Sequence, residues 1–487
     1  MSSFYTSTDH FVLLPALLLA MFGCSILLFD FWIFPQDKLR KHLIWFLVLG
    51  EVFTAAALLR QQSFLGEHGG ALVAFNGSLL IDGFALFFHW LFLAATLIVA
   101  LISYRYLEVR EEHHGEYYGI LMLAQCGMFF LASGTDLVTM FVGLELMAVS
   151  FYILVGFLRS DKRSNEAALK YLLLGAFSSG FLAYGFSLLY GMAGSTKLHD
   201  VVTAVAARDL KDPLLLMAIG TVSVGLFFKV SAVPFHMWAP DAYEGAPTSV
   251  TAFLSVGSKA ASFALLIRVF TALGAARPVW EPVLAGVALL SLTVGNFAAV
   301  TQTNTKRLLA YSSISHAGYM LLGLVAGNER GMQGMLVYLL VYTFMNLGAF
   351  LVIIALNQKN LAGEDVSDLG GLIHRSPGYA LLMLVFLLSL SGIPPTAGFI
   401  GKYYIFLALV EAKMYFLAVV AALYVAVAVF YYFRMVRSMF VEKQEQTAPL
   451  MTSFGMRAAL VVTGLATLVV GLYPEPFVRL AQTSLMR

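Results

Sequence analysis

The sequence predicts an all-α polytopic membrane protein with about fourteen transmembrane helices. Of its 487 residues, 60% are hydrophobic and only 12% are charged, whereas about a quarter of the residues in a soluble domain are charged. A helix needs roughly 20 apolar residues to cross the hydrocarbon core, and apolar runs of that length recur along the whole chain. The longest polar stretches, 191 to 212 and 357 to 377, are the size of loops. We therefore expect a single membrane domain over residues 1 to 487.

Fourteen apolar runs are predicted to span the membrane. Three form a peripheral group over 10 to 103, five form a first repeat unit over 117 to 272, five form a second repeat unit over 278 to 434, and the last helix covers 456 to 480. Their approximate bounds are 10 to 33, 42 to 60, 79 to 103, 117 to 132, 136 to 158, 166 to 190, 213 to 232, 250 to 272, 278 to 299, 307 to 326, 332 to 356, 378 to 410, 414 to 434 and 456 to 480.

Two of the predicted spans contain proline and are expected to be broken helices. Pro234 removes a backbone donor and clashes with the carbonyl four residues earlier, so the seventh span must break beside Lys229. Pro394 and Pro395, flanked by glycines, interrupt the twelfth span before Lys402. Broken helices in corresponding places of two repeats mark the transport site of many transporters, because unpaired backbone at membrane depth survives only beside a cavity. The pattern predicts two inverted five-helix repeats.

Composition excludes several classes of function. The 30 basic and 28 acidic residues nearly cancel, so the chain lacks the basic surplus of a nucleic-acid-binding protein. Cys24 and Cys126 both lie in apolar runs and do not form a cluster-binding or zinc-binding pattern. Only two histidines, His89 and His316, lie inside spans and away from their ends, which does not match a haem protein with paired ligands. No glycine-rich phosphate loop is present, so we expect this chain to bind neither NADH nor another cofactor.

Lysine and arginine in the loops predict the orientation. Cytoplasmic loops carry the excess of these residues, and the excess falls on the loops that face inward if the N-terminus lies outside. An even number of spans then places both termini on the outer, periplasmic side.

Four charged residues lie deep in the predicted spans and are the primary candidate site. Glu145 follows Asp136 by nine residues, which at 1.5 Å per residue places it about 13 Å into the fifth span. Lys229 and Lys402 adjoin the breaks, and Lys259 lies in the eighth span. A charge at such depth costs several kcal/mol, so it normally faces a partner or a proton path. Because desolvation makes a lysine release its proton more readily, each lysine is a candidate proton carrier.

Other readings stay open for these and for several secondary residues. Glu145 could instead form a structural ion pair or stay protonated, and Lys402 or Lys170 could reach the interface as ordinary anchors. His316, among the hydroxyls of YSSISHAGY, is a candidate for a water wire or a structural group, and His236 lies at the first break. These secondary candidates are His236, His316 and Lys170. The sequence assigns no role to Glu51, midway along the second span.

Four stretches of the chain closely resemble the antiporter-like subunits of respiratory complex I, and the subunit N family above the others. They read GLELM at 143 to 147, FFKVSAVPFHMWAPDAYEGAPTSVTAFLSVGSKAA at 227 to 261, TNTKRLLAYSSISHAGY at 303 to 319 and SLSGIPPTAGFIGK at 389 to 402. Lys259 stands where the resemblance to subunit N expects a lysine. Lys402 replaces the glutamate that is typical of subunit M.

The resemblance implies a proton-translocating membrane-arm subunit of NADH:quinone oxidoreductase, a translocase driven by quinone reduction in partner subunits. It implies that Glu145 pairs with Lys229, that Lys259 is the central relay and that Lys402 exchanges protons with the outer side. It also implies that NADH, FMN, iron–sulfur clusters and quinone are bound by other subunits of the complex. The expected partners are neighbouring membrane-arm subunits and the lipid bilayer. The full-length first group of three spans looks bacterial or plastid-like, unlike the shortened animal mitochondrial form, and we expect the inner (plasma) membrane of a bacterium.

Two alternatives from other functional classes remain. One is a subunit of a multisubunit sodium/proton antiporter, whose large subunits share this fold, and the lysine of the eighth span is the feature that separates the two. The other is a passive membrane scaffold. Four buried charges along one path disfavour a scaffold, because each charge lowers stability.

Overall fold

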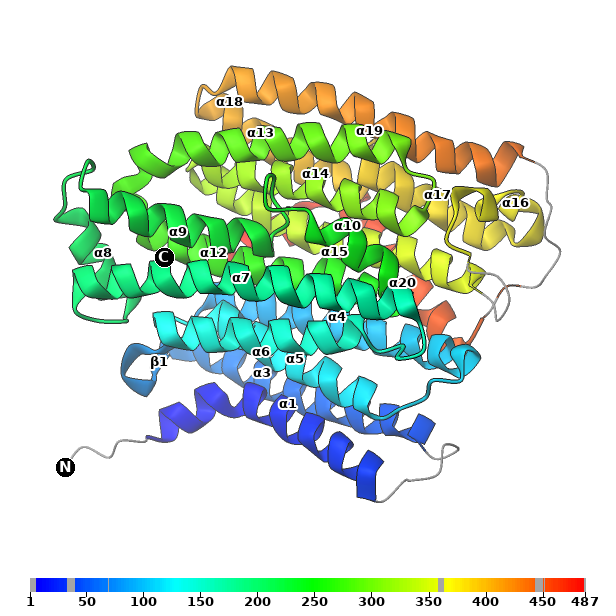
Figure 1. Ribbon diagram of the computed structural model, residues 1–487, viewed down its shortest axis with the longest axis horizontal. Coiled ribbons are helices and arrows are strands. Elements are labelled where there is room, and N and C mark those ends of the chain that lie inside the picture. Colours follow the sequence, from blue (N-terminus) through cyan, green and yellow to red (C-terminus); the bar gives the residue numbers. More distant parts are fainter. Residues whose placement is uncertain are drawn as a thin grey trace.

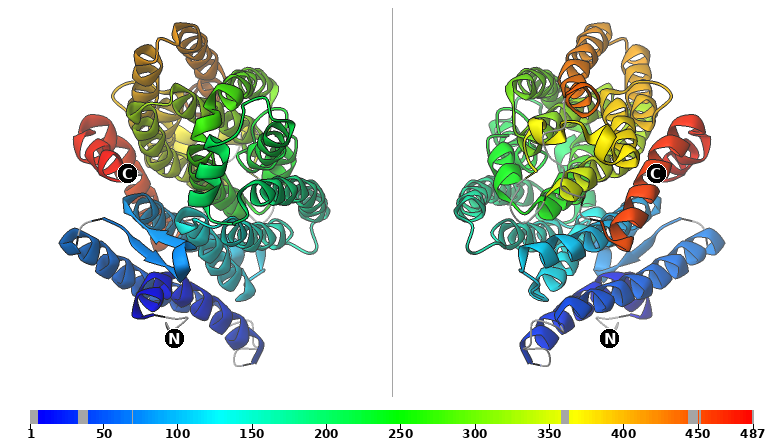
Figure 2. Two further views of the ribbon diagram at one scale, coloured as in Figure 1. Left: turned by 90° about the vertical axis from the view of Figure 1, so that its left-hand side faces the viewer. Right: turned by 90° about the vertical axis from the view of Figure 1, so that its right-hand side faces the viewer.

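Helices make up most of the described chain. The computed structural model describes residues 6–32, 40–68, 70–357, 363–442, 450 and 452–485. The helices run side by side along one long axis (Figure 1), and Figure 2 views them nearly end-on. The strands found in the described ranges are β1 (Leu72–Ala74) and β2 (Leu79–Ile81), which pair antiparallel. The predicted all-α membrane fold is therefore confirmed, with one short hairpin added at an end of the bundle.

The peripheral group comprises α1, α3 and α4. Their bounds are α1 (Ser7–Trp32), η1 (Lys41–Leu43), α3 (Ile44–His68), η2 (Phe75–Gly77) and α4 (Gly83–Arg110). The third span was predicted to begin at residue 79, and that start was wrong because Leu79–Ile81 form β2. Helix α4 begins after Asp82, whose carboxylate accepts a hydrogen bond from the Ala85 amide at 2.7 Å. Such N-terminal capping fixes the start of a helix.

The first repeat unit contains the first broken helix. Its elements are α5 (Glu116–Ser133), α6 (Leu137–Val155), α7 (Lys162–Ala193), α8 (Leu198–Ala206), α9 (Pro213–Lys229), α10 (Trp238–Gly245), α11 (Thr248–Phe253), a π-helical turn (Leu254–Ser258) and α12 (Lys259–Ala272). Asp136, Asp161 and Asp212 cap α6, α7 and α9 by accepting hydrogen bonds from backbone amides. The loop predicted at 191 to 212 includes the short helix α8.

The second unit and the last helices complete the chain. They are η4 (Gly274–Ala276), α13 (Arg277–Thr301), α14 (Thr305–Ala326), α15 (Glu329–Leu356), η5 (Val366–Leu369), α16 (Leu372–Arg375), α17 (Pro377–Ser391), α18 (Ala397–Glu411), α19 (Tyr415–Val441), α20 (Phe454–Leu472) and α21 (Glu475–Thr483). The prediction of one continuous helix over 456 to 480 was wrong. Tyr473 and Pro474 divide it into α20 and α21.

Every predicted span coincides with a helix. Eleven helical stretches of the described residues are long and apolar enough to cross a membrane. The remaining three predicted spans coincide with α5, α9 and the α17–α18 pair. Helices α9 and α17 are only 17 and 15 residues long, because each ends at a break.

The two broken helices run in opposite directions. Arg307, at the start of α14, pairs with Asp241 of α10 at 2.9 Å, whereas Arg330, at the start of α15, pairs with Glu411 at the end of α18 at 3.0 Å. Helix α14 lies between these two ends of the bundle. The chain therefore leaves the first break toward one end and the second break toward the other, as inverted repeats require.

The two described termini lie toward the same end of the bundle (Figure 1). The carboxylate of Asp9 in α1 accepts a hydrogen bond from the Phe75 amide beside β1 at 2.5 Å. Near the other terminus, Gln333 at the start of α15 donates to the Val478 carbonyl of α21 at 3.2 Å.

Candidate functional site: a line of buried lysines

Lys229 is the last residue of α9 and lies at the first break. The chain turns through Val230 to Met237, and the indole of Trp238 donates to the Phe228 carbonyl at 2.9 Å, which satisfies one of the carbonyls left free by the helix end. The Lys229 side chain is buried, and its Nζ has no hydrogen-bond partner within the described chain. Such a group is normally hydrated, because a buried polar atom without a partner is costly.

Glu145 lies on α6 and is half-buried, with Oε1 enclosed and without a hydrogen-bond partner in the described chain. Its charge acts on Lys229 through space. The two side chains form no ion pair in this structure, so the pairing implied by the family resemblance is not a direct contact here. Tyr152, also within Coulombic range of Glu145, has a buried hydroxyl without a hydrogen-bond partner among the described residues.

Lys259 is the first residue of α12 and directly follows the π-helical turn. Its Nζ donates to the Ser313 carbonyl at 2.7 Å and to the Ser313 hydroxyl. In the turn, Ser255 accepts a hydrogen bond from the Asn346 amide of α15 at 2.7 Å. Turns of this kind are frequent at functional sites. Lys259 is 2% exposed, and its contacts are to α14, the helix that lies between the two breaks.

His316 continues this polar line along α14. Its Nδ1 lies 2.7 Å from the Tyr338 hydroxyl, and its Nε2 lies 3.2 Å from the Tyr432 hydroxyl. Tyr432 is in turn hydrogen-bonded to Ser312. Because a neutral imidazole has one donor and one acceptor nitrogen, His316 can take a proton from one tyrosine side and release one toward the other. Both ring nitrogens of His316 are thus hydrogen-bonded, which agrees with a relay group and with a structural group alike.

Lys402 lies on α18 and reaches back across the second break. Its Nζ donates to the carbonyls of Leu390 and Ser391 at 3.1 and 2.9 Å, the last carbonyls of α17, where the helix dipole favours a cation. It also lies 4.9 Å from the ring centre of Tyr319. Both Lys402 and Lys259 are within Coulombic range of His316. The α14 side chains thus lie between the two lysines.

The secondary candidates have different surroundings. His236 is buried in the first break, and its Nδ1 has no hydrogen-bond partner among the described residues. Lys170, expected as an interface anchor or a weak candidate, forms ion pairs with Glu166 at 2.8 Å and Asp241 at 3.0 Å. Glu51 is buried and accepts a hydrogen bond from the Gln125 amide at 3.1 Å, apart from the lysines.

A charged mouth lies beside α10, at the end where α14 begins. A cavity of about 230 Å³ is lined by Arg163, Glu166, Ala167, Lys170, Asp241, Glu244, Gly245 and Arg307. Burial by itself would raise the pKa of the Asp241 carboxyl, but hydrogen bonds from Lys170 and Arg307 lower it below its ordinary value. The mouth is therefore a network of paired charges between α7, α10 and the start of α14.

Several polar groups of the site were missed by sequence reasoning. They are Tyr243, Tyr338, Tyr342, Tyr432, Lys306, Glu364 and Arg268. Hydroxyl-bearing residues in apolar helices give no distinctive pattern, and Glu364 follows a polar stretch that reads as a loop. Arg268 is buried in α12 and pairs with Asp82 at 2.9 Å. The charge of Arg268 inside the eighth span was the one available signal.

Comparisons with known proteins agree with this geometry. The family described as NADH:quinone oxidoreductase/Mrp antiporter, TM, matches residues 134–428. The chain is 65% identical to NADH-quinone oxidoreductase subunit N 2 of Solibacter usitatus, covering 100% of this chain and 99% of that one. It is 50% identical to NADH-quinone oxidoreductase subunit N 1 of Koribacter versatilis, covering 98% and 96%.

Solved structures show the same fold. A chain of respiratory complex I from Thermus thermophilus is 35% identical, with a TM-score of 0.80 and coverage of 96% of this chain and 98% of that chain. A chain of the Mrp complex from Dietzia is 20% identical, with a TM-score of 0.83 and coverage of 98% and 97%, and this likeness concerns the fold alone. The broken helices, the family match and the close relatives lead to one conclusion: the chain belongs to the NADH-quinone oxidoreductase subunit N family of antiporter-like membrane proteins.

Proposed function

We propose that this chain is a proton-translocating membrane-arm subunit of an NADH:quinone oxidoreductase. The observation that carries the proposal is the line of buried groups from Lys259 through Ser313 and His316 toward Lys402. Lysine, serine, tyrosine and neutral histidine can each donate and accept a proton or a hydrogen bond in turn. Proton transfer along such a line needs only short side-chain movements.

The broken helices supply the places where the line meets water. Lys229 lies at the first break within Coulombic range of Glu145, and Lys402 lies at the second break. Helix α10, which follows the first break, lines the charged mouth. We assign Glu145 and Lys229 to the loading side, Lys259 to the central relay and Lys402 to exchange with the outer side. His236, at the first break, is a secondary group on the loading side, and Lys170 orders the mouth through Asp241.

The energies involved are compatible with pumping. A unit-charge pair at 4 Å in an effective dielectric of 20 is worth about 4 kcal/mol. Moving one proton against 100 mV requires about 2.3 kcal/mol. Closing and opening the Glu145–Lys229 pair therefore changes the free energy of a proton on Lys229 by enough to drive its transfer onward to Lys259.

The driving reaction takes place elsewhere. We propose that this chain acts as a translocase without a redox site of its own, and that NADH, FMN, iron–sulfur clusters and quinone are bound by other subunits. Its partners are the neighbouring membrane-arm subunits and lipid. We place it in the inner membrane of a bacterium with both termini on the periplasmic side.

The test is substitution of the relay lysines in the assembled complex. Lys259→Met keeps much of the side-chain volume but cannot carry a proton, so proton transfer through this chain should fall about 100-fold or more. Lys229→Met and Glu145→Gln should act in the same direction.

The control is Lys211→Met, at an exposed lysine before α9. Proton pumping by inverted vesicles and the amount of assembled complex are measured together. Normal pumping by the Lys259 and Lys229 variants would refute the relay.

An independent sodium/proton antiporter is the second candidate, because the family description and the Dietzia fold include this class. The 65% and 50% identical relatives favour the oxidoreductase. Expression of this chain alone in an antiporter-deficient host decides between them. No gain of salt tolerance is expected, and robust sodium extrusion would favour the antiporter.

A further inference from the structure

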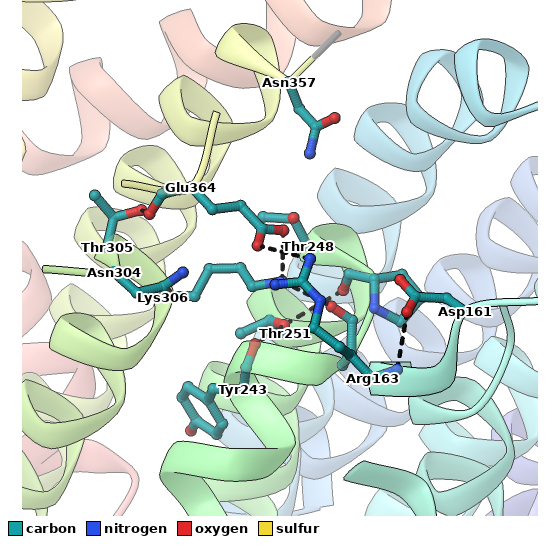
Figure 3. Close-up of polar contacts among 12 residues, drawn as sticks. Asp161, Arg163, Tyr243, Thr248, Thr251, Asn304, Thr305, Lys306, Asn357 and Glu364 are labelled. Carbon is teal, nitrogen blue, oxygen red and sulfur yellow. Dashed lines mark hydrogen bonds and ion pairs between the residues drawn. The ribbon is translucent and has the colours of Figure 1, made fainter. Parts of the chain in front are cut away.

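Lys306 and Glu364 form an ion pair that lies almost wholly inside the protein (Figure 3). Lys306 Nζ is 2.8 Å from Glu364 Oε1, and the two side chains are 2% and 7% exposed. Lys306 also donates to the Ala246 carbonyl, between α10 and α11, at 3.0 Å. The pair thus joins the start of α14, the end of α10 and the segment before η5.

The backbone holds Glu364 firmly in this position. The amide and hydroxyl of Thr305 both donate to the Glu364 carbonyl, at 2.6 and 2.5 Å. The other carboxylate oxygen, Oε2, accepts no hydrogen bond in the described chain and lies 3.6 Å from the Arg163 guanidinium. The Arg163 side chain is 58% exposed and lines the charged mouth. One side of the Glu364 carboxylate therefore faces buried Lys306, and the other faces a water-accessible arginine.

A series of hydroxyl groups leads from the ion pair toward Lys259. Lys306 and Ser313 are seven residues apart on α14, so they share one face and are separated by about 10.5 Å along the axis. The Tyr243 hydroxyl lies 3.4 Å from the Ser313 hydroxyl, which accepts a hydrogen bond from Lys259. Figure 3 shows Thr248, Thr251 and Tyr243 extending from the ion pair along α10 and α11.

Two features of this segment do not fit a purely structural tie. The Thr248 side chain is fully buried and its hydroxyl has no hydrogen-bond partner among the described residues. Buried ion pairs contribute little net stability, since desolvation of both charges offsets their attraction. A titratable pair that connects water to a buried polar series has a direct use in proton transfer.

We propose that Glu364 takes up protons from the mouth and that Lys306 passes them to Lys259 through Tyr243 and Ser313. Deprotonated Lys259 receives a proton from the Lys306 ammonium along the hydroxyl groups. The Glu364 carboxylate takes up one proton from the inner-side water beside Arg163 and passes it to neutral Lys306, which restores the ammonium and the carboxylate of the ion pair. The net result is transfer of one proton from the inner side to Lys259. This inference rests on the proposed function.

Glu364→Gln in the assembled complex tests the assignment. Inverted membrane vesicles are used, because their inner-side surface faces the medium and its pH can be set. We expect normal assembly and pumping lowered about tenfold at alkaline pH. Pumping should recover as the medium is acidified, because water then supplies protons more rapidly to the remaining path. Glu116→Gln removes a half-exposed carboxylate outside the mouth, paired with Arg159 at 3.2 Å, and is expected to behave as the unmodified complex.

The pH dependence of pumping also reflects the titratable and charged groups around Glu364. They are Lys306 of α14, Arg163 of α7, Tyr106 and Arg110 of α4, Glu244 of α10, and the neighbouring Asp365 and Asp368. Glu364→Asp keeps a titratable carboxyl and serves if the glutamine variant assembles poorly. Where both variants assemble, Glu364→Asp should pump more than Glu364→Gln. Where only Glu364→Asp assembles, its loss of pumping at alkaline pH should recover as the medium is acidified.

The outcomes separate this inference from the proposed function. Pumping by Glu364→Gln with the magnitude and pH profile of the unmodified complex would overturn the uptake role, as would a loss in both Glu364 variants that acid does not relieve. If Lys259→Met abolishes pumping in those same preparations, the relay stands and only the uptake route fails. If Lys259→Met pumps normally, the proposed function itself fails.

Discussion

Lys259 donates hydrogen bonds to both the carbonyl and the hydroxyl of Ser313, a residue 54 positions later on another helix. The contact lies three residues before His316, on the helix that separates the two broken helices. A lysine held in this way has its proton directed at a hydroxyl that can pass it on. In the proposed relay, this contact is the point where the loading side meets the release side.

Ser313→Ala should slow proton transfer without preventing assembly. The variant leaves Lys259 bonded to the carbonyl alone, and a lost hydrogen bond to a charged group is worth about 1.5–3 kcal/mol. We expect pumping to fall by about 10-fold to 100-fold, the rate equivalent of that energy. Ser262→Ala is the matched control, because the buried Ser262 hydroxyl donates to the Ser258 carbonyl of its own helical segment. Equal pumping by both variants would show that the Ser313 hydroxyl is not used.

His316→Gln should interrupt proton transfer between Lys259 and Lys402. Glutamine can hydrogen-bond to the Tyr338 and Tyr432 hydroxyls, but it cannot take up and release a proton at neutral pH. Pumping is expected to fall strongly while the quantity of complex is unchanged. His89→Gln provides the comparison, since His89 is also buried in the membrane but bonds to the Phe129 carbonyl at 3.1 Å, outside the line. A similar loss from both substitutions would indicate general damage to packing.

The sequence predicted the features that depend on local rules. Pro234, Pro394 and Pro395 located both breaks, because proline acts on its own helix. Asp136 located the start of α6 and hence the depth of Glu145. Contacts between distant segments were not predictable from one sequence.

The Lys259–Ser313 contact and the Lys306–Glu364 pair depend on how α12, α14 and the segment before η5 pack, and spacing along the chain says nothing about that. The π-helical turn before Lys259 also has no sequence signal of its own. Glu364 follows a polar stretch, where an acid is usually exposed, and it becomes a buried residue only because Thr305 binds its backbone.

Asp241 should make the stability of the folded protein depend on pH in the acid range. Hydrogen bonds from Lys170 and Arg307 keep the pKa of its carboxyl below the ordinary value of 3.8 in the folded state. The carboxylate therefore contributes stability above that pH, and the contribution is lost as the pH falls through the folded-state pKa. Asp241→Asn should lower the unfolding temperature at pH 7 and flatten its fall in acid. A parallel pair of curves from about pH 5 down to about pH 2 would contradict the assignment.

Gly392→Ala should disturb Lys402 by filling the space at the second break. Gly392 has a φ of +83°, which disfavours any residue with a Cβ, and an added Cβ would lie 2.7 Å from Lys402 Cδ. The strain of such a backbone is on the order of 1–3 kcal/mol, so the purified complex should unfold at a lower temperature and pump less. Gly378→Ala, in the first turn of α17, is the control because nothing lies within 4 Å of its added Cβ. The two variants are compared by thermal unfolding and by pumping in vesicles. If Gly392→Ala matches Gly378→Ala in both measurements, Lys402 does not need the close approach to the end of α17 that the structure shows.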